Sequence, residues 1–510
     1  MTPARGERAT WRFLGFWENG DLDLAATRAN LPADDLHTAE LIAGEIWPQM
    51  LSYIPGKVGR WHIWNGRCRP ADDCGAIDKI IHSYARWAEA LCAAVRQRVT
   101  AETGTDDKAT AAMLKETGWE PVLRYVGGLR RAGGLASLKA VLGQQCSVAE
   151  ADLDDTLPYR VNTASGLVSL LPVSRREDLE GDAREIIPHA PGQMITYCLG
   201  QEWVPGADCP QYRALIWRAA GEDQQVYEYL IRVLGYSLLG HNPRQLVFFL
   251  AGPTASGKSK MLEGAARVLA GLAHKAQTAL IAHQRYGRNA REENSIRGKR
   301  LVTIAETSSR IHIEEAQLKR LTGEDWITVD RHYAAELVPT RVSWLIVIAT
   351  NQMPTVLAFD TALRRRIVVI PMGPTIPEQL RDDALLERIM ETEAAGILNL
   401  LVQGCRLAME DGGLQPPQVV ADKTAEYAAE QRSETNWLAE RAVYQPVASQ
   451  NGHPGKVGGV PMSEAWEDYE IWAGRAPHLG RNEFYEALEG AEGVERRGRV
   501  FLGFKLKYGG

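Results

Sequence analysis

A motif at residues 252–259 constrains this chain more than any other feature of its sequence. It matches the phosphate-binding loop pattern G-x-x-x-x-G-K-[ST], and its residues are Gly252, Pro253, Thr254, Ala255, Ser256, Gly257, Lys258 and Ser259. An apolar run at residues 246–251 precedes the motif, and a stretch with apolar residues at helical spacing follows it. This context predicts a buried strand, a loop and a helix, which is the setting that a phosphate-binding loop needs.

The residue types of this motif fit the chemistry of a bound triphosphate. Glycines allow backbone N–H groups to close around phosphate oxygens, and the start of the following helix adds a favourable dipole. We expect Lys258 to reach the β- and γ-phosphates and Ser259 to coordinate Mg²⁺. A chance glycine-rich turn is the alternative, but it would not need the flanking strand and helix patterns. The motif therefore predicts binding of ATP together with Mg²⁺.

Bulk composition narrows the class of protein. The chain has 510 residues, of which 45% are hydrophobic and 24% charged, as in a globular protein with about three or four domains. Its formal net charge is −6, so nucleic acid would have to meet a local basic patch rather than a global positive field. No apolar run is long enough to span a membrane and no secretory signal is recognisable, which predicts a cytoplasmic protein.

The seven cysteines are scattered without the spacing of a disulfide framework, which fits a reducing compartment. Cys68 and Cys74 lie near His62 and His82 in the sequence, so this group is a candidate zinc site. No second cysteine pair follows at the usual spacing, and the sequence therefore favours no bound zinc.

Hydrophobic periodicity divides the chain into helical and mixed segments. Residues 77–91, 210–240 and 377–443 carry apolar residues at helical spacing, whereas residues 246–372 alternate strand and helix patterns. Residues 449–459 have the composition of a flexible linker, and residues 463–510 form a last small module. Alternating strands and helices predict an α/β core with a parallel sheet.

Two further strand patterns in this α/β core end in polar side chains. The apolar run at residues 300–305 ends in Glu306, and the run at residues 344–350 ends in Asn351. If the first of these strands lies beside the phosphate-loop strand, Glu306 can hold Mg²⁺ or polarise the attacking water, and Asn351 can orient that water. Each residue alone also fits an ordinary strand end, but together with the phosphate loop they predict a hydrolytic site.

Three consecutive arginines precede the last strand pattern of the core. Arg364, Arg365 and Arg366 come directly before the apolar residues 367–370. Adjacent cations next to a buried strand are costly unless phosphates or carboxylates meet them. An arginine finger supplied to a neighbouring subunit is the functional interpretation. A solvent-exposed run of charge is the alternative, and both interpretations stay open at this point.

The order of these motifs resembles that of superfamily III helicases. The resemblance rests on the phosphate loop, Glu306-Thr307, residues 318–325 (LKRLTGED), residues 348–351 (IATN) and Arg365-Arg366-Ile367. Within that superfamily the chain is similar to the phage and plasmid primase–helicase family, which also contains the poxvirus primase–helicase. The similarity extends upstream through Cys209-Pro210 and residues 234–240 (LGYSLLG), and downstream to residues 466–506.

The resemblance implies an AAA+-like P-loop NTPase that works as a DNA helicase. It implies a homo-hexameric ring with ATP sites between subunits and single-stranded DNA in a central channel. The implied roles are nucleotide and Mg²⁺ binding by Lys258 and Ser259, metal binding and water activation by Glu306, γ-phosphate sensing by Asn351, and action in trans by Arg365 or Arg366. A hairpin at residues 326–338 would grip the DNA, with contacts expected from Lys319, Arg331, His332 and Tyr333.

The resemblance also implies an order of domains along the chain. A mostly helical N-terminal region spans residues 1–205, a helical collar that mediates oligomerisation spans residues 206–244, and the helicase core spans residues 245–375. C-terminal helices at residues 376–445 and a linker at residues 446–462 lead to a winged-helix module at residues 463–510. The tip of a predicted hairpin in that module could contact duplex origin DNA through Arg496, Arg497 and Arg499. A solvated basic surface is the alternative.

The same residues define what the protein is expected to do. No Asp-x-Asp metal pair with a downstream histidine is recognisable, so we expect no primase activity and a separate primase or polymerase as partner. The prediction is an ATP-dependent replicative helicase of a phage, prophage or plasmid, in the cytoplasm of a bacterial host. An ATP-switched loader or initiator that assembles replication factors without unwinding is the alternative. The arginines and the hairpin favour the helicase, because a switch needs neither.

Overall fold

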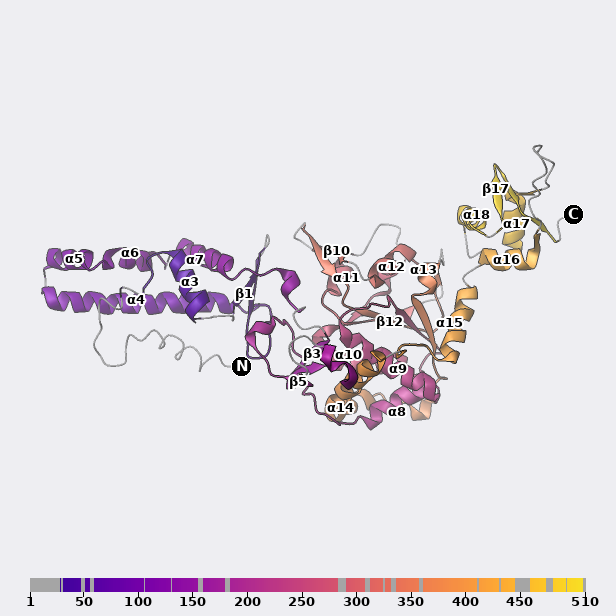
Figure 1. The fold of residues 1–510 in the computed structure, drawn as a ribbon, viewed down its shortest axis with the longest axis horizontal. Helices are drawn as coiled ribbons and strands as arrows, with labels where there is room; N and C mark the ends of the chain where they lie inside the picture. Colours follow the sequence, from indigo (N-terminus) through magenta and orange to yellow (C-terminus); the bar gives the residue numbers. More distant parts are fainter. Residues whose placement is uncertain are drawn as a thin grey trace. The chain divides into compact units, whose positions relative to one another are not determined.

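The computed structural model describes most of the chain, and its described residues form two compact units (Figure 1). The described residues are 28, 31–46, 51–55, 59–104, 106–129, 131–154, 159–178, 184–282, 290–307, 312–323, 326–331, 336–356, 361–410, 412–430, 433–444, 459–473, 480–491 and 493–507. The first unit is Met1–Pro158 with Ile186–Cys198, and the second is Tyr159–Glu185 with Leu199–Gly510. Residues 159–185, which the predicted N-terminal region includes, thus pack with the second unit.

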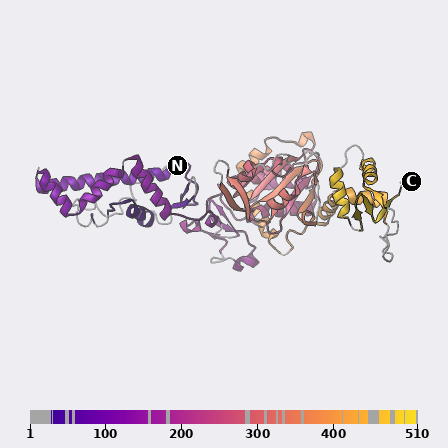
Figure 2. The same ribbon diagram turned by 90° about the horizontal axis from the view of Figure 1, so that it is seen from above.

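The first unit consists mainly of helices and contains one small hairpin (Figures 1 and 2). Its helices are α3 (Asp35–Glu40), α4 (Ala76–Thr103), α5 (Asp107–Glu116), α6 (Trp119–Leu129) and α7 (Ala132–Gln145), with a π-helix η2 (Leu41–Ile46) and short turns η3 (Glu150–Asp152) and η5 (Pro191–Gln193). The hairpin pairs β1 (Leu51–Ile54) with β2 (Arg60–Ile63), and β5 (Ile186–Ile187) follows. The helix predicted at residues 77–91 is confirmed as the first half of α4. Its apolar stripe, including Tyr84, shares one core with Trp119 and Val122 of α6.

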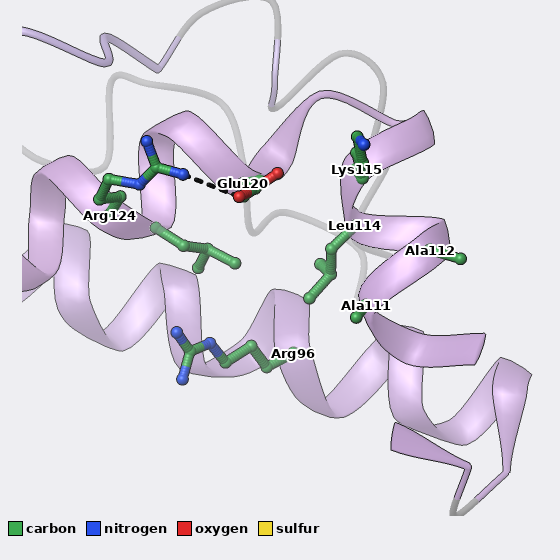
Figure 3. A pocket seen from close by; sticks show the side chains of 8 residues that line it. Arg96, Ala111, Ala112, Leu114, Lys115, Glu120 and Arg124 are labelled. Atoms are coloured by element: carbon green, nitrogen blue, oxygen red, sulfur yellow. Dashed lines mark hydrogen bonds and ion pairs between the residues drawn. The ribbon is translucent and has the colours of Figure 1, made fainter. Parts of the chain in front are cut away.

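A groove of about 570 Å³ lies between α4, α5 and α6 of the first unit. Figure 3 shows Arg96, Lys115 and Arg124 along its walls, one from each helix. Arg124 donates a hydrogen bond to Glu120 Oε1 at 2.8 Å. The lining therefore contains three cations and one carboxylate, which makes this groove a local basic surface on a chain with net negative charge.

A five-stranded parallel sheet forms the centre of the second unit. Its strands are β6 (Val247–Ala251), β7 (Ala273–Ala276), β8 (Leu301–Thr307), β12 (Leu345–Thr350) and β14 (Ile367–Pro371), in the order β14-β6-β12-β8-β7. The predicted strands of the α/β core are confirmed. The expectation that the strand of Glu306 lies directly beside the phosphate-loop strand is wrong, because β12 lies between them. All six residues of β12 are buried, as expected for a strand covered on both faces, but such an apolar run does not specify which strands lie beside it.

Helices cover both faces of this sheet. Val247 and Phe249 of β6 pack in one core with residues of α12 (Glu315–Thr322) and with Tyr427 of α15 (Gln418–Glu430). Phe248 lies between them in sequence and therefore faces the other side, where it meets Tyr229 of α9 at a ring-centroid distance of 6.3 Å. The helices associated with that side are α8 (Pro210–Ala219), α9 (Gln224–Tyr236), α10 (Lys258–Leu269) and α14 (Leu385–Ala408). Because helices cover both faces of the sheet, side chains on both sides of each strand are buried, which explains the continuous apolar runs in the sequence.

A hairpin of β3 (Arg160–Thr163) and β4 (Gly166–Ser169) belongs to the second unit and is held by Arg406 of α14. Arg406 donates through Nη2 to the Ser169 carbonyl at 2.9 Å, and its Nη1 lies 2.9 Å from Glu185 Oε1. Its guanidinium also lies 5.6 Å from the ring centroid of Trp203. These contacts account for the packing of residues 159–185 with α14.

The remaining elements of the α/β core are short. They are η4 (Val173–Asp178), η6 (Ser237–Leu239), η7 (Ala270–Leu272), η8 (Thr278–Leu280), η9 (Glu378–Leu380), α11 (Ala290–Ser295), α13 (Thr361–Arg364), β9 (His312–Ile313), β13 (Thr355–Val356), β10 (Trp326–Arg331) and β11 (Glu336–Arg341). The hairpin predicted at residues 326–338 is confirmed, since β10 and β11 pair antiparallel. Trp326 lies opposite Arg341, and Arg331 lies opposite Glu336.

The chain ends in a small module with an aromatic core. Its elements are α16 (Ser433–Arg441), β15 (Ala442–Tyr444), β16 (Val460–Pro461), α17 (Met462–Ala473), α18 (Arg481–Glu489), β17 (Glu495–Arg497), β18 (Val500–Leu502) and β19 (Phe504–Leu506). Trp437 of α16 is fully buried in one core with Tyr469, Phe484 and Phe504. Its Nε1–H donates a hydrogen bond to Asp468 Oδ1 at 2.8 Å. The module thus includes α16 and β15, upstream of residue 463 where the sequence analysis starts it. No helix of the described segments is long and apolar enough to cross a membrane.

Candidate nucleotide-binding site

The phosphate loop lies between the end of β6 and the start of α10. Gly257 has a φ of 93°, a left-handed conformation that glycine adopts without strain. Gly252 has no room for a side chain, since a Cβ atom there would lie 2.8 Å from Cβ of Met372. Ala255 takes a φ of 58°, which is uncommon for a residue with a side chain and is typical of constrained functional turns. The backbone conformation at Gly257 and the close packing at Gly252 therefore explain why the motif has glycine at both positions.

Lys258, the first residue of α10, points back into the loop. The residue is 6% exposed, and its Nζ donates to the carbonyl oxygens of Gly252 and Pro253 at 2.7 Å each and to Ser256 Oγ at 3.0 Å. These acceptors are neutral, and burial lowers the pKa of the ammonium group from its ordinary 10.5. A phosphate oxygen would improve the electrostatic environment of this cation. The loop therefore fits an anionic ligand.

Asn351 approaches the same ammonium group from the neighbouring strand. Its Oδ1 accepts a hydrogen bond from Lys258 Nζ at 3.3 Å. The parallel register of β12 and β6 pairs Thr350 with Ala251, so Asn351 and Gly252 follow at the same edge of the sheet. The sheet brings together the predicted loop lysine and the predicted sensor residue, which are 93 positions apart in the sequence.

Glu306 lies at this same edge of the sheet, near the end of β8. The β12–β8 register pairs Ala349 with Ala305 but Thr350 with Thr307, so Glu306 is an extra residue in the ladder. Bulges of this kind redirect side chains and are common next to active sites. The side chain of Glu306 lies outside the described part of the chain, and the structure gives the position of its backbone alone.

The predicted magnesium ligands are Ser259 and Glu306. Ser259 is exposed and lines the same cavity as Lys258. Within the described residues, no group of three or more His, Cys, Asp or Glu side chains is arranged to hold a metal ion. Mg²⁺ does not need such a group when nucleotide phosphates and water supply most of its oxygen ligands. Ser259 is therefore placed where it could bind a metal ion that arrives with the nucleotide, and Glu306 stays a predicted ligand.

A cavity of about 420 Å³ opens beside the phosphate loop, which is a volume typical of small-molecule sites. Loop residues and Asn351 form part of its lining. Residues of α8 and of the segment 376–385 form another wall, which consists of Gln211, Ala214, Leu215, Arg218, Ile376, Leu380, Arg381, Asp382, Asp383 and Leu385. This wall was not predicted from the sequence, although positions 211, 214, 215 and 218 have the spacing of one helix face.

The segment at residues 375–385 is attached to the phosphate loop by hydrogen bonds. Ile376 N–H donates to the Ala255 carbonyl at 2.9 Å, and Thr375 Oγ1 donates to the Thr254 carbonyl at 3.0 Å. Lys260 Nζ donates to the Asp382 carbonyl at 2.6 Å. The phosphate loop and this wall of the cavity therefore form one hydrogen-bonded structure.

The three arginines lie at the opposite edge of the sheet from the phosphate loop. β14 is parallel to β6, with Ile367 paired to Val247 and Pro371 paired to Ala251. The arginines precede Ile367, whereas the phosphate loop follows Ala251. The length of a strand therefore separates the arginines from the loop of their own chain.

The arginines also differ in their surroundings. Arg366 is 8% exposed, whereas Arg364 and Arg365 are exposed. Arg365 donates through Nη2 to Gln245 Oε1 at 2.8 Å. The structure therefore leaves Arg364 and Arg365, rather than Arg366, accessible to a second molecule.

The predicted DNA contacts are described in part. Lys319 of α12 forms an ion pair with Glu315 one turn earlier. Arg331 ends β10, but its side chain and the whole of His332 and Tyr333 lie outside the described residues. The structure therefore confirms the β10–β11 hairpin, and DNA contacts by Arg331, His332 and Tyr333 stay predictions.

The basic hairpin predicted near the C-terminus is confirmed by the pairing of β17 with β18. Arg496 lies 3.1 Å from Glu489 Oε2, and Arg497 lies 2.9 Å from Glu495 Oε1. Arg499 is exposed in the turn next to Gly498, whose φ is 66°. Two of the three predicted contacts are thus paired with carboxylates of their own module.

Part of the chain is distantly similar to a viral helicase. No protein-family model matches the chain. A stretch of 151 residues is 27% identical to the putative helicase L207/L206 of Acanthamoeba polyphaga mimivirus, and it covers 29% of this chain but 16% of that relative. The solved C-terminal region of NrS-1 aligns with a TM-score of 0.39 and 12% identity over 61% of this chain and 79% of that chain. JCV helicase aligns with a TM-score of 0.28 and 11% identity over 67% and 87%. Structural similarity at these TM-scores carries no argument about function.

Proposed function

We propose that this chain is an ATP-dependent DNA helicase of superfamily III that serves replication of a phage, prophage or plasmid. The observation that carries the proposal is the convergence of Lys258 and Asn351, 3.3 Å apart, at one end of a cavity of about 420 Å³. The backbone of Glu306 lies at the same sheet edge. The 27% identity to the mimivirus putative helicase supports a helicase among the possible ATPases.

In this proposal ATP binds with its phosphates in the loop at residues 252–259. Backbone N–H groups of the loop and the positive end of α10 stabilise the phosphate oxygens. Lys258 exchanges its neutral acceptors for oxygens of the β- and γ-phosphates. Mg²⁺, held by Ser259 and Glu306, would supply charge neutralisation at those oxygens. Asn351 positions the attacking water, and Glu306 accepts its proton.

The position of the arginines supports a ring of subunits. Because they lie a strand length away from the loop of their own chain, an arginine finger would have to enter a neighbouring site. Arg365 is the first candidate, since it is exposed and its partner Gln245 is neutral. The proposed assembly is a homo-hexamer around single-stranded DNA. The β10–β11 hairpin would face the DNA, with Lys319, Arg331, His332 and Tyr333 as contacts.

Mixing two inactive variants tests this assembly. Lys258→Ala removes the lysine of the phosphate loop, Arg365→Ala removes the finger, and neither variant should hydrolyse ATP alone. Mixed rings contain interfaces that join an intact Lys258 to an intact Arg365, so ATP hydrolysis should reappear. If neither Arg365→Ala nor the parallel variant Arg364→Ala complements Lys258→Ala, no arginine of this exposed pair acts in trans.

The C-terminal module would act as a winged helix that binds duplex DNA at an origin. Two helices followed by a hairpin, with Arg496, Arg497 and Arg499 exposed on the hairpin, support this assignment. A separate primase or polymerase would complete replication in the cytoplasm of a bacterial host. A template-dependent primer product made by the purified chain would contradict the expected lack of primase activity.

An ATP-switched loader that assembles replication factors is the second candidate. The observation in its favour is that candidate DNA contacts are paired with carboxylates, including Lys319 with Glu315 and Arg496 with Glu489. Cations that already have partners gain less from a phosphate backbone than free cations do. Assembled protein that hydrolyses ATP without unwinding DNA would favour this candidate.

A further inference from the structure

A buried carboxylate behind the nucleotide cavity fixes the orientation of one side chain on the cavity wall. Glu393 of α14 is 5% exposed and lies at the N-terminal end of α8. Its Oε1 accepts hydrogen bonds from the backbone N–H and from Nε2 of Gln211, each at 3.0 Å, and its Oε2 accepts from Tyr212 N–H at 3.0 Å. Three donors thus converge on one carboxylate.

These contacts determine which end of the Gln211 amide remains available. A carboxylate accepts hydrogen bonds and cannot donate them, so the NH₂ group of Gln211 must face Glu393. The oxygen of the same amide then points away from Glu393, and no hydrogen bond to it is present among the described residues. Gln211 also lines the nucleotide cavity. The cavity wall therefore contains the amide oxygen of Gln211, and the hydrogen bond from the Gln211 NH₂ group to Glu393 fixes the orientation of that oxygen.

The surroundings of Gln211 suit the base of a nucleotide. Ala214 and Leu215 continue the same face of α8, and Ile376 and Leu380 line the cavity as well, so apolar side chains that could pack against a base lie near Gln211. The same lining also contains the charged residues Arg218, Arg381, Asp382 and Asp383. The phosphate loop lines the same cavity, and Leu215 of α8 lies against it, since a Cβ atom on Gly257 would be 3.5 Å from Leu215. Gln211 precedes Leu215 by about one helical turn on the same face of α8. A nucleotide that extends along this wall from phosphates in the loop would bring its base toward Gln211.

We propose that Gln211 is a specificity-determining residue that accepts a hydrogen bond from the exocyclic amino group of adenine. The proposal rests on the proposed binding of a nucleoside triphosphate to the loop. Adenine carries an amino group at the position where hypoxanthine and guanine carry a carbonyl oxygen. The Gln211 oxygen attracts the amino group and repels the carbonyl. Glu393 is a positioning residue, because it holds the amide in the orientation that makes this choice.

The test compares ATP with inosine triphosphate (ITP), which carries a carbonyl oxygen in place of the adenine amino group. Dissociation constants are measured on the full chain by displacement of a fluorescent ADP. The wild type should bind ATP about tenfold more tightly than ITP, the effect of about one hydrogen bond. Gln211→Leu keeps the side-chain bulk but removes the acceptor, so the ratio should fall to about one. The matched control Gln225→Leu, at an exposed position in the first turn of α9, should keep the ratio.

A second variant separates the positioning role from the contact itself. Glu393→Gln lets the Gln211 amide turn either way, so the preference for ATP should shrink although Gln211 is intact. Glu391→Gln, an exposed position on the same helix, is the matched control. Because Glu393→Gln also weakens the cap of α8, circular dichroism must show that the helices remain. Gln211→Leu leaves the backbone contacts to Glu393 in place and keeps the test decisive.

The outcomes distinguish this inference from the proposed function. Equal affinity of the wild type for ATP and ITP, or a preference that survives Gln211→Leu, would overturn the inference while nucleotide binding stands. Failure of both nucleotides to displace the fluorescent ADP would overturn the proposed function and this inference with it.

Discussion

The side chains of Lys258 and Asn351 meet in the nucleotide site, with Lys258 Nζ 3.3 Å from Asn351 Oδ1. The lysine thus donates a hydrogen bond to the amide oxygen of Asn351. A γ-phosphate would compete for Nζ and release the amide for the attacking water. Our hypothesis is that this exchange couples the nucleotide state to the end of β12.

Asn351→Ala should abolish the orientation of the attacking water. We expect kcat for ATP hydrolysis to fall by about 10²–10³, the usual effect of removing one preorganised polar group. The KM should change less, because Lys258 and the phosphate loop, which would bind the phosphates, stay intact. Steady-state kinetics of Asn351→Ala and of the neighbouring exposed control Gln352→Ala give the comparison. Equal kcat values for the two variants would remove Asn351 from the mechanism.

Nucleotide affinity should depend on pH through Lys258. Burial lowers the pKa of this lysine from 10.5 in the free protein, and a bound triphosphate would raise it again. At pH values below the lowered pKa, the lysine is charged in both states and affinity is independent of its titration. As pH rises through the lowered pKa, affinity should fall by up to about tenfold per pH unit. Titrations of ATP binding across the alkaline range measure this, and Lys258→Ala should show weak binding without that dependence.

Two glycines set the distance between α9 and α14. A Cβ atom on Gly235 would lie 2.2 Å from Cys405 N, and one on Gly404 would lie 2.2 Å from the Ile231 carbonyl oxygen. Backbone atoms cannot rotate away, so Gly235→Ala should destabilise the second unit by about 1–3 kcal/mol. Thermal unfolding should shift downward by about 2–4 °C per kcal/mol. Gly271→Ala has no atom within 4 Å of the added Cβ and is the control; an equal effect there would contradict the packing argument.

Arg499 should contribute most among the three arginines of the β17–β18 hairpin to duplex binding. Arg496 and Arg497 already have carboxylate partners, whereas Arg499 lies exposed in the turn. Arg499→Ala should weaken binding to all duplex sequences alike and reduce the salt slope by about one. Lys505→Ala removes one charge elsewhere in the module and should have a smaller effect. Deletion of residues 463–510 is a poorer test, because it would expose Trp437.

Local patterns predicted the elements of the site, since each depends on neighbours in sequence. The phosphate loop, the start of α10 and the strands ending near Glu306 and Asn351 were all recognisable from apolar runs and their polar ends. The order of the strands in the sheet was not recognisable from the sequence, because each strand pairs with strands that are distant in the sequence. β12 pairs with β6 on one side and β8 on the other, and an apolar run in the sequence does not reveal which strands will pair with it.

The features missed by sequence reasoning all depend on tertiary packing. The wall of the cavity joins α8 to residues 375–385, and its key polar group is held by Glu393 from a third segment. Arg365 and Arg366 are adjacent arginines, yet Arg366 is buried whereas Arg365 is exposed. Trp437 joins the C-terminal module although a predicted linker separates it from residue 463. In each case the deciding partner is distant in the sequence.

Unwinding of a forked DNA by wild-type protein and by Lys258→Ala tests the central claim most directly. The account predicts ATP-dependent strand separation by the wild type and none by Lys258→Ala, with both proteins equally folded and assembled. Strand separation that persists in Lys258→Ala would show that the phosphate loop does not drive it. ATP hydrolysis by assembled wild type without any unwinding would contradict the helicase and favour the ATP-switched loader.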